Sequence, residues 1–289
     1  MFCEGTYRRS VRRSSAGALS ALSLPRPHVF GAIVWRDYLT KRSYRLGFAL
    51  DVFNGLLTLT IYFFISRFFS EPDRAALNHA PTYFAFATAG ILVAAMIQSG
   101  SVEVAVRLRE EQLTGTLETL AGHPVLPGEL SLGLVGFPFT FAVGRALVYF
   151  VIVSALIGLD LHRVSWIGLV VVLLATGAAF AAIAIAAAAA ILVVKRADMI
   201  LTMVIGVTVV FSGSVFPISS LPGWLQPVAR VLPPHIAFDG VRNALFRGAD
   251  WALDAVELLT IAAIGIPVAA AIFGFALRAA QRSGSLSEY

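Results

Sequence analysis

The sequence predicts an all-α membrane protein with six transmembrane helices, and this prediction rests on composition and on the length of the apolar runs. Of the 289 residues, 58% are hydrophobic and only 13% are charged, whereas about a quarter of a soluble domain is charged. Six windows are apolar over about 20 residues, the length that crosses the hydrocarbon core of a bilayer as a helix. These windows do not alternate in polarity as the strands of a transmembrane barrel do.

The borders of these windows give the expected spans. They cover 46–68, 81–102, 137–159, a part of 164–194, 199–216 and 256–277. The fourth window is rich in alanine and glycine, a composition that favours close packing between helices in lipid. The helix propensity of alanine explains the same composition, and the two interpretations are compatible. Together the windows define a transmembrane domain over 46–278.

The distribution of basic residues predicts the orientation. If the N-terminus is inside, fifteen of the 22 lysines and arginines fall on cytoplasmic pieces, and Arg145 falls within the third span. The other six lie on outer pieces: Arg67, Arg74, Arg163, Arg230, Arg242 and Arg247. Cytoplasmic loops carry the excess of basic residues, so both termini are predicted to be cytoplasmic in a cell membrane. Anionic lipid, rather than nucleic acid, is the natural partner for this charge.

The segments outside the domain are predicted from composition. An Arg/Ser-rich stretch over 1–27 is expected to be a disordered cytoplasmic tail, and 279–289 is expected to be the cytoplasmic C-terminal tail. Residues 28–45 interleave aromatic and basic side chains, which favours a helix in the inner membrane interface, with a simple basic flank as the alternative. The single cysteine, Cys3, allows no intrachain disulfide, and no metal cluster is suggested.

The stretch EEQLTGTLETLAGHP, 110–124, is an acidic insert between apolar blocks. The second span continues into it as a polar helix, Gly115 breaks the pattern, and Leu117 and Leu120 fall on one face of a restarted helix. Glu118 lies in the first turn of that piece, where the helix dipole favours an anion. The pattern predicts a helix, an elbow and a short helix across the cytoplasmic face of the membrane. A solvated linking loop is equally compatible with the residues alone.

The last outer segment, 216–248, carries five prolines yet stays largely apolar. Because proline interrupts helices, we expect two short helical pieces that dip into the outer leaflet. Non-helical backbone at that depth needs protein or water to satisfy it. The segment is therefore expected to cap a pathway or to pack against a partner subunit.

Three motifs together resemble the permeases of ABC-2-type transporters. REEQLTGTLETLAGHP is similar to the cytoplasmic coupling segment of that family. SGSVFPISSLPGWLQPVARVLPPHIAFDGVRNALFRG resembles the family signature before the final span, and WRDYLTKRSYRLGF resembles the entry into the first. His123 stands where the family pattern has a small polar residue. The resemblance covers roughly 35–278, nearly the whole chain.

This resemblance implies a half-transporter that exports a lipid, a glycan or glycolipid, or a hydrophobic drug-like substrate. Two permeases, identical or paired with a sister chain, would associate with two copies of a separate ATPase. ATP and Mg²⁺ would bind to the ATPase, so we expect no cofactor, metal or catalytic residue on this chain. The residues expected to couple it to the ATPase are Glu110, Glu111, Gln112, Gly115, Thr116 and Glu118. Spans two and five would line the route, with an exit gate at Pro217, Leu221, Pro222 and Trp224.

Other function classes are less well supported by the residues. A phosphate-binding P-loop needs Gly-Lys followed by Ser or Thr, and neither Lys41 nor Lys195 has these neighbours. The sequence has no HExxH or GxSxG motif, which argues against an intramembrane enzyme. A secondary transporter or channel without ATP coupling remains the alternative; such proteins often carry intramembrane carboxylates.

Asp51 and Arg145 are the only charged residues well inside a predicted span. Asp51 lies a few residues into the first span and Arg145 about two turns into the third. Both spans start on the same side, and at about 1.5 Å per residue their depths are similar enough for an arginine to reach across. We therefore expect an intramembrane ion pair between Asp51 and Arg145, with separate snorkelling of each charge as the alternative.

Overall fold

The computed structural model describes residues 35, 38–39, 45–67, 77, 79–113, 127–157, 164–193 and 197–283, and every element within these ranges is helical. Four helices are long and apolar enough to cross a membrane. They are α4 (Tyr83–Leu113), α6 (Pro127–Ile157), α7 (Trp166–Val193) and α11 (Trp251–Ser283). Two further helices, α3 (Arg45–Ser66) and α8 (Ala197–Phe211), contain shorter apolar stretches.

These six helices fall on the six windows predicted from hydropathy, but several are longer than the windows. Helix α6 begins at Pro127, well before the expected start at 137, and α11 continues past 278 to Ser283. The windows record only the apolar length that matches lipid, whereas backbone hydrogen bonding carries a helix on through polar residues. Most of the expected interfacial helix, 28–45, and the tail 1–27 lie outside the described residues.

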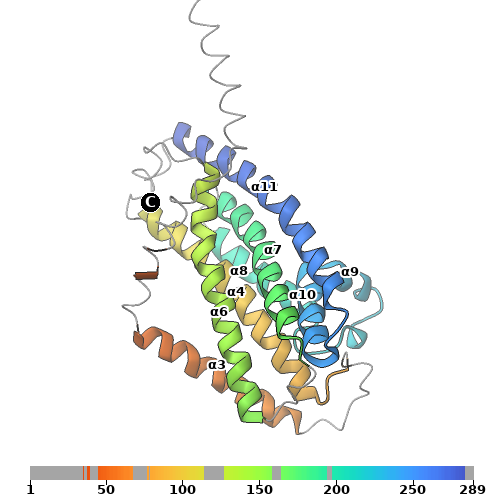
Figure 1. Cartoon of the computed structure of the whole chain (residues 1–289). Helices are drawn as coiled ribbons and strands as arrows, with labels where there is room; N and C mark the ends of the chain where they lie inside the picture. The colour runs from red at the N-terminus through yellow and green to blue at the C-terminus, as the bar shows by residue number, and fades with distance from the viewer. Residues whose placement is uncertain are drawn as a thin grey trace, which may run out of the picture.

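Helix α7 is the centre of the bundle. It lies between α6 and α11 (Figure 1), and α11 packs along it more extensively than any other pair of helices packs. Of its most apolar window, 67% is buried, against 28% for α11. Small residues make the close approach possible, since a Cβ on Gly265 of α11 would lie 2.9 Å from Cβ of Ala182 in α7. This contact fits the packing role predicted for the Ala-rich window.

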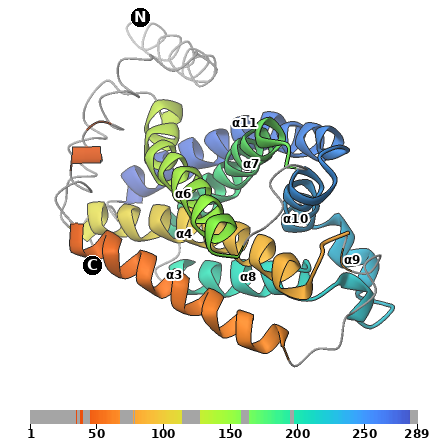
Figure 2. The same cartoon turned by 60° about the horizontal axis from the view of Figure 1, so that its bottom comes forward.

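Helices α3 and α8 both pack on α4 (Figure 2). The rings of Phe63 in α3 and Phe84 in α4 meet edge to face, with centroids 5.4 Å apart. Helix α3 also approaches α6, because a Cβ on Gly55 would lie 2.8 Å from Oη of Tyr149. Near the end of the first span, Phe63 thus contacts a neighbouring helix, while Phe64 is 60% exposed.

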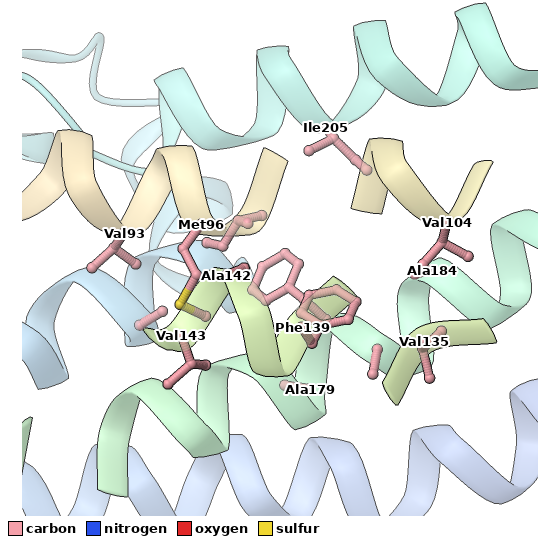
Figure 3. Packing of buried hydrophobic residues seen from close by; sticks show 14 of the residues in the cluster. Val93, Met96, Val104, Val135, Phe139, Ala142, Val143, Ala179, Ala184 and Ile205 are labelled. Atoms are coloured by element: carbon pink, nitrogen blue, oxygen red, sulfur yellow. The ribbon is translucent and has the colours of Figure 1, made fainter. Parts of the chain in front are cut away.

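The apolar core includes residues of α3, α4, α6, α7, α8 and α11. Figure 3 shows Phe139 of α6 among Met96, Val104 and Ala179, with Ile205 of α8 nearby. Gly100 of α4 leaves room for the Phe139 ring, which a Cβ at that position would approach to 2.6 Å. Close packing of this kind fixes the position of α4 relative to α6 along its middle third.

The segment between α8 and α11 contains four short helical pieces where we expected two. They are η3 (Ile218–Ser220), α9 (Gln226–Val231), α10 (Pro233–Arg242) and the π-helix η4 (Asn243–Arg247). Prolines occupy the first turns of α9 and α10, where a missing N–H breaks no intrahelical bond. The segment, called here the outer segment, packs on α4, α7 and α11 beside the starts of these three helices.

Candidate functional site

Three of the predicted coupling residues, Glu110, Glu111 and Gln112, lie at the end of α4 that is far from the outer segment. Glu110 is exposed and Glu111 is half-buried in the last turns of the helix, and the backbone of Gln112 continues it. Gly115, Thr116 and Glu118 lie outside the described residues. The structure therefore places the helical start of the coupling segment, while the predicted elbow stays a prediction.

The polar extension of α4 is packed rather than free. Val104 and Leu108 are fully buried along it. Arg107 pairs with Glu103 at 2.9 Å between Nη2 and Oε1, and its guanidinium lies 5.2 Å from the centroid of the Phe137 ring in α6. A force on Glu110 and Glu111 would consequently act on a helix that is tied to α6 and to the core.

The four predicted gate residues follow one another around η3 and α9, but their side chains do not converge. Pro217 precedes η3 and is half-buried, and Leu221 ends it and is 9% exposed. Pro222 is exposed, and Trp224 is 76% exposed. Of these four residues, only Leu221 is buried against the rest of the protein. Trp224 instead presents an amphipathic ring to the surroundings, as tryptophans at membrane interfaces do.

The predicted pair Asp51–Arg145 lies one turn before the contact between α3 and α6. Gly55 and Tyr149, which meet at that contact, each follow one of the two charged residues by four positions. Arg145 is half-buried, and the side chain of Asp51 lies outside what the structure describes. The ion pair between Asp51 and Arg145 therefore stays a prediction.

A buried arginine in the outer segment forms a second candidate site, which the sequence reasoning did not single out. Arg242 is the last residue of α10 and is only 2% exposed. Its Nη2 donates to the backbone carbonyls of Gly213 at 2.9 Å, Ser214 at 3.1 Å and Phe86 at 3.4 Å. The guanidinium also lies on the face of the Phe86 ring, 3.6 Å from its centroid. These contacts join α10 to α4 and to the chain that leaves α8.

Two glycines allow these elements to approach so closely. A Cβ on Gly90 of α4 would lie 1.7 Å from the carbonyl oxygen of Ser214, so no other residue fits there without moving the backbone. Gly213 adopts φ +91°, in the left-handed region that favours glycine, and turns the chain directly after α8. Arg242, Phe86, Gly90, Gly213 and Ser214 are called here the Arg242 junction.

The charge of Arg242 is retained despite its burial. Burial lowers the pKa of Arg242 to about 10, and the carboxylate of Asp239, whose Oδ1 lies 3.9 Å from Nη1, opposes that shift. The residue therefore remains a cation at neutral pH, stabilised by three carbonyls and by the negative face of an aromatic ring. An unpaired buried charge would be strongly destabilising.

Two further polar residues of α10, His235 and Asp239, lie near the Arg242 junction. Nε2 of His235 lies 3.3 Å from Oδ2 of Asp239, one turn along the helix. That carboxylate raises the pKa of His235, but burial lowers it by more, and Arg242 and Arg230 add to the lowering. His235 is consequently neutral at pH 7, and its contact with Asp239 is a hydrogen bond rather than an ion pair.

Comparison with known protein families decides which kind of protein carries these sites. The model of the ABC-2 type transporter family matches residues 28–246, three quarters of the chain. The chain belongs to the ABC-2 type transporter family. No curated protein and no solved structure matches it. As an ABC-2 permease it is a multi-pass transport subunit, in agreement with the helices described above.

The family match includes both candidate sites. The acidic end of α4 and the Arg242 junction both lie within 28–246. Helix α4 runs without interruption from the predicted coupling residues at one end to the Arg242 junction at the other, between Glu111 and Phe86. The sequence signal that points to the junction is an apolar stripe on α10. Its residues Ala237, Phe238 and Val241, which are buried in the structure, come just before Arg242.

Proposed function

We propose that this permease is the membrane subunit of an ATP-driven exporter, energised by a separate ABC ATPase. Two permease chains, identical or paired with a sister chain, associate with two ATPase subunits. Both termini and the acidic end of α4 are on the cytoplasmic side, and the outer segment is on the opposite side. The family match carries this proposal, together with the continuous α4, which spans both candidate sites.

The coupling residues Glu110, Glu111, Gln112, Gly115, Thr116 and Glu118 form the contact with the ATPase in this proposal. Movement of the ATPase acts on the exposed and half-buried glutamates at the end of α4. Because Arg107 ties this part of α4 to Phe137, the helix responds as a packed element rather than as a loose extension. Asp51 and Arg145 form an ion pair that holds α3 to α6 one turn before Gly55.

The substrate is an amphipathic or lipid-linked molecule, either a lipid, a glycan or glycolipid, or a hydrophobic drug-like compound. Helices α4 and α8 line its route, and Pro217, Leu221, Pro222 and Trp224 lie at the exit. The exposed faces of α8, which include Met199, Met203, Val207 and Val210, are apolar as such a route requires. Transport without ATP coupling is the alternative, and the experiment below distinguishes the two.

The proposal is tested with the tagged chain purified together with an ABC ATPase from its native membrane and placed in proteoliposomes. A fluorescent phospholipid, a lipid-linked glycan and a hydrophobic dye serve as transport probes. We expect ATP-dependent movement of at least one probe. We also expect the double variant Glu111→Lys and Glu118→Lys to lose ATPase co-purification, because reversal of interface charges weakens association by about 2–5 kcal/mol.

The matched control is Glu288→Lys, which makes the same kind of charge reversal next to the C-terminal residue and should leave co-purification unchanged. ATP hydrolysis by the permease chain alone, above that of a mock preparation, would overturn the proposal. Probe movement that is independent of ATP, in a wild-type chain that purifies without an ATPase, would favour the uncoupled transporter. Unchanged co-purification in the double variant would contradict the role given to the two glutamates.

A further inference from the structure

Three consecutive residues of the outer segment bind to four different helices or their ends. Arg242 binds the carbonyl of Phe86 in α4 and the carbonyls of Gly213 and Ser214 after α8. Nδ2 of Asn243 donates to Oδ2 of Asp254 in α11 at 2.8 Å. The carbonyl of Ala244 accepts from the N–H of Ser165, just before α7, at 2.9 Å. Residues 242–244 therefore connect α4 and α8 on one side with α7 and α11 on the other.

The guanidinium of Arg242 binds the chain directly after α8 rather than the last turn of the helix itself. In that turn the carbonyl of Val210 already accepts from the N–H of Gly213, and Arg242 donates to the next carbonyls, those of Gly213 and Ser214. The last turn of α8 contains no basic residue, so Arg242 brings a positive charge from another element close to the negative end of this helix. The same Ser214 carbonyl fits against Gly90 of α4, so the bond from Arg242 and the contact with Gly90 hold it from two sides.

Of the three linking residues, Arg242 makes the bonds that reach α4. Its bonds come from one side chain in a fixed planar arrangement, which favours a defined geometry over a loose attraction. The face of the Phe86 ring fixes the guanidinium from one side, and Phe238 lies 5.7 Å away on α10. Removing the guanidinium would leave the packing of α10 on α4 in place but would remove the hydrogen bonds from α10 to the carbonyls of Gly213, Ser214 and Phe86.

We propose that Arg242 is a positioning residue for transport, which locks the end of α8 and the outer segment to α4 so that they move as one block. This inference rests on the proposed function, in which the ATPase acts at the opposite end of α4. Because α4 is one continuous helix between Glu111 and Phe86, a displacement at the coupling end reaches the Arg242 junction through a rigid element. The bonds of Arg242 then transmit this displacement of α4 to the outer segment.

Transport is measured first, as the number of probe molecules moved per ATP hydrolysed, with the probe that the wild type moves. We expect Arg242→Met to lower this ratio about tenfold, within the usual range of coupling between sites, while ATP hydrolysis and ATPase co-purification persist. Arg242→Lys should recover part of the ratio, since an ammonium keeps the charge but not the planar fork.

The matched control is Arg247→Met, five positions along the same segment. Arg247 is 41% exposed and pairs with the exposed Asp250, at 2.8 Å between Nη2 and Oδ2. Its loss removes the same charge without touching α4 or α8, so the transport ratio should be unchanged. An equal ratio in Arg242→Met and wild type would overturn the proposal, and so would an equal loss in Arg247→Met.

A distance measurement tests whether Arg242 fixes the outer segment to α4, and it needs no ATP, ATPase or substrate. Spin labels are placed at Ala95 of α4 and Ser219 of η3, both exposed, in a chain in which Cys3, the one native cysteine, is changed to serine. We expect one narrow distance distribution in wild type and in Arg247→Met, and a broad one in Arg242→Met. A narrow distribution in Arg242→Met would contradict the lock even if transport proved to be ATP-driven.

The two measurements separate the two proposals. A broad distribution in Arg242→Met, with no ATP-dependent transport in wild type, would refute the proposed function and leave the lock standing. If Arg242→Met does not accumulate in membranes, Arg242→Lys and Phe86→Leu carry the same test, because each weakens one part of the junction. Narrow distributions in both of these variants would overturn the lock.

Discussion

The Arg242 junction and the interface between α7 and α11 hold helices together in two different ways. At the junction a buried cation bonds to backbone carbonyls from separate elements. Along α7 and α11, small residues simply allow close approach, as Gly265 does beside Ala182. Helices in lipid lack the hydrophobic driving force that joins them in water, so packing and direct bonding must hold them. The comparison shows this protein using bonding at the outer segment and packing along the bundle.

The two kinds of contact also differ in how far they can adapt. Gly265 faces the methyl group of Ala182, and a Cβ 2.9 Å from it is admitted only if α7 and α11 move apart. Gly90 faces the Ser214 carbonyl at 1.7 Å, and this carbonyl is held by Arg242 and by the turn at Gly213. The junction should therefore tolerate added volume less well than the α7–α11 interface does.

The largest expected effect is that of Gly90→Ala. The new Cβ would lie 1.7 Å from the Ser214 oxygen and 2.8 Å from Nη2 of Arg242, so the backbone after α8 must move and the guanidinium contacts must break. We expect a loss of about 3 kcal/mol or more, at the upper end of overpacking effects. Thermal unfolding of the detergent-solubilised protein measures it.

The control for this substitution is Gly144→Ala in α6, where a Cβ would meet nothing within 4 Å. Because alanine is about 1 kcal/mol more favourable than glycine inside a helix, this variant should be as stable as the wild type or slightly more so. If Gly90→Ala unfolded at the same temperature as Gly144→Ala, the close fit at the junction would be wrong.

A smaller effect is expected for Gly265→Ala, which makes the same change at the other interface. Its Cβ would lie 2.9 Å from Cβ of Ala182, and a slight separation of α7 and α11 relieves the contact. The strain is then partly offset by the helix propensity of alanine, so a net loss of about 1 kcal/mol or less is expected. The same unfolding measurement applies, and a loss as large as that of Gly90→Ala would remove the distinction between the two regions.

The sequence predicted the helices well because lipid imposes a simple requirement. A window of apolar residues long enough to cross the hydrocarbon core identifies a span with no knowledge of its neighbours. The same rule carries no information on burial, as α7 and α11 show: both are strongly apolar, yet their windows are 67% and 28% buried. Burial depends on which helices meet, and the small residues of α7 were the only local indication of it.

The Arg242 junction was missed for a related physical reason. Arg242 was counted among the outer basic residues, since an arginine in a loop is normally solvated. What permits its burial comes from elsewhere in the chain: the carbonyls of Gly213 and Ser214 and the ring of Phe86. A single sequence shows none of these contacts. Likewise, nothing in the sequence distinguishes Gly90 from the other small residues of its span. Only the position of the Ser214 carbonyl in the folded protein shows why a glycine is needed there.

The smallest expected effect is on pH dependence, and it again separates the two regions. The contact of Gly265 with Ala182 involves no ionisable side chain, whereas His235 lies beside Asp239 in the outer segment. Burial lowers the pKa of His235 below its ordinary value of 6.5, against the opposing effect of Asp239. At a pH below 6.5 the unfolded chain therefore binds a proton at this position more readily than the folded protein does.

The stability contributed by neutral His235 is consequently complete above pH 6.5, decreases as the pH falls from 6.5 through the lowered pKa, and then levels off. We expect His235→Gln to show a shallower loss of thermal stability than wild type between about pH 7.5 and pH 5. Asp239→Asn should steepen the loss, because it removes the carboxylate that raises the pKa of His235. Gly265→Ala should leave the pH dependence as in wild type, since it changes stability equally at every pH. Identical pH profiles for His235→Gln and wild type would show that His235 does not make the stability of the outer segment depend on pH.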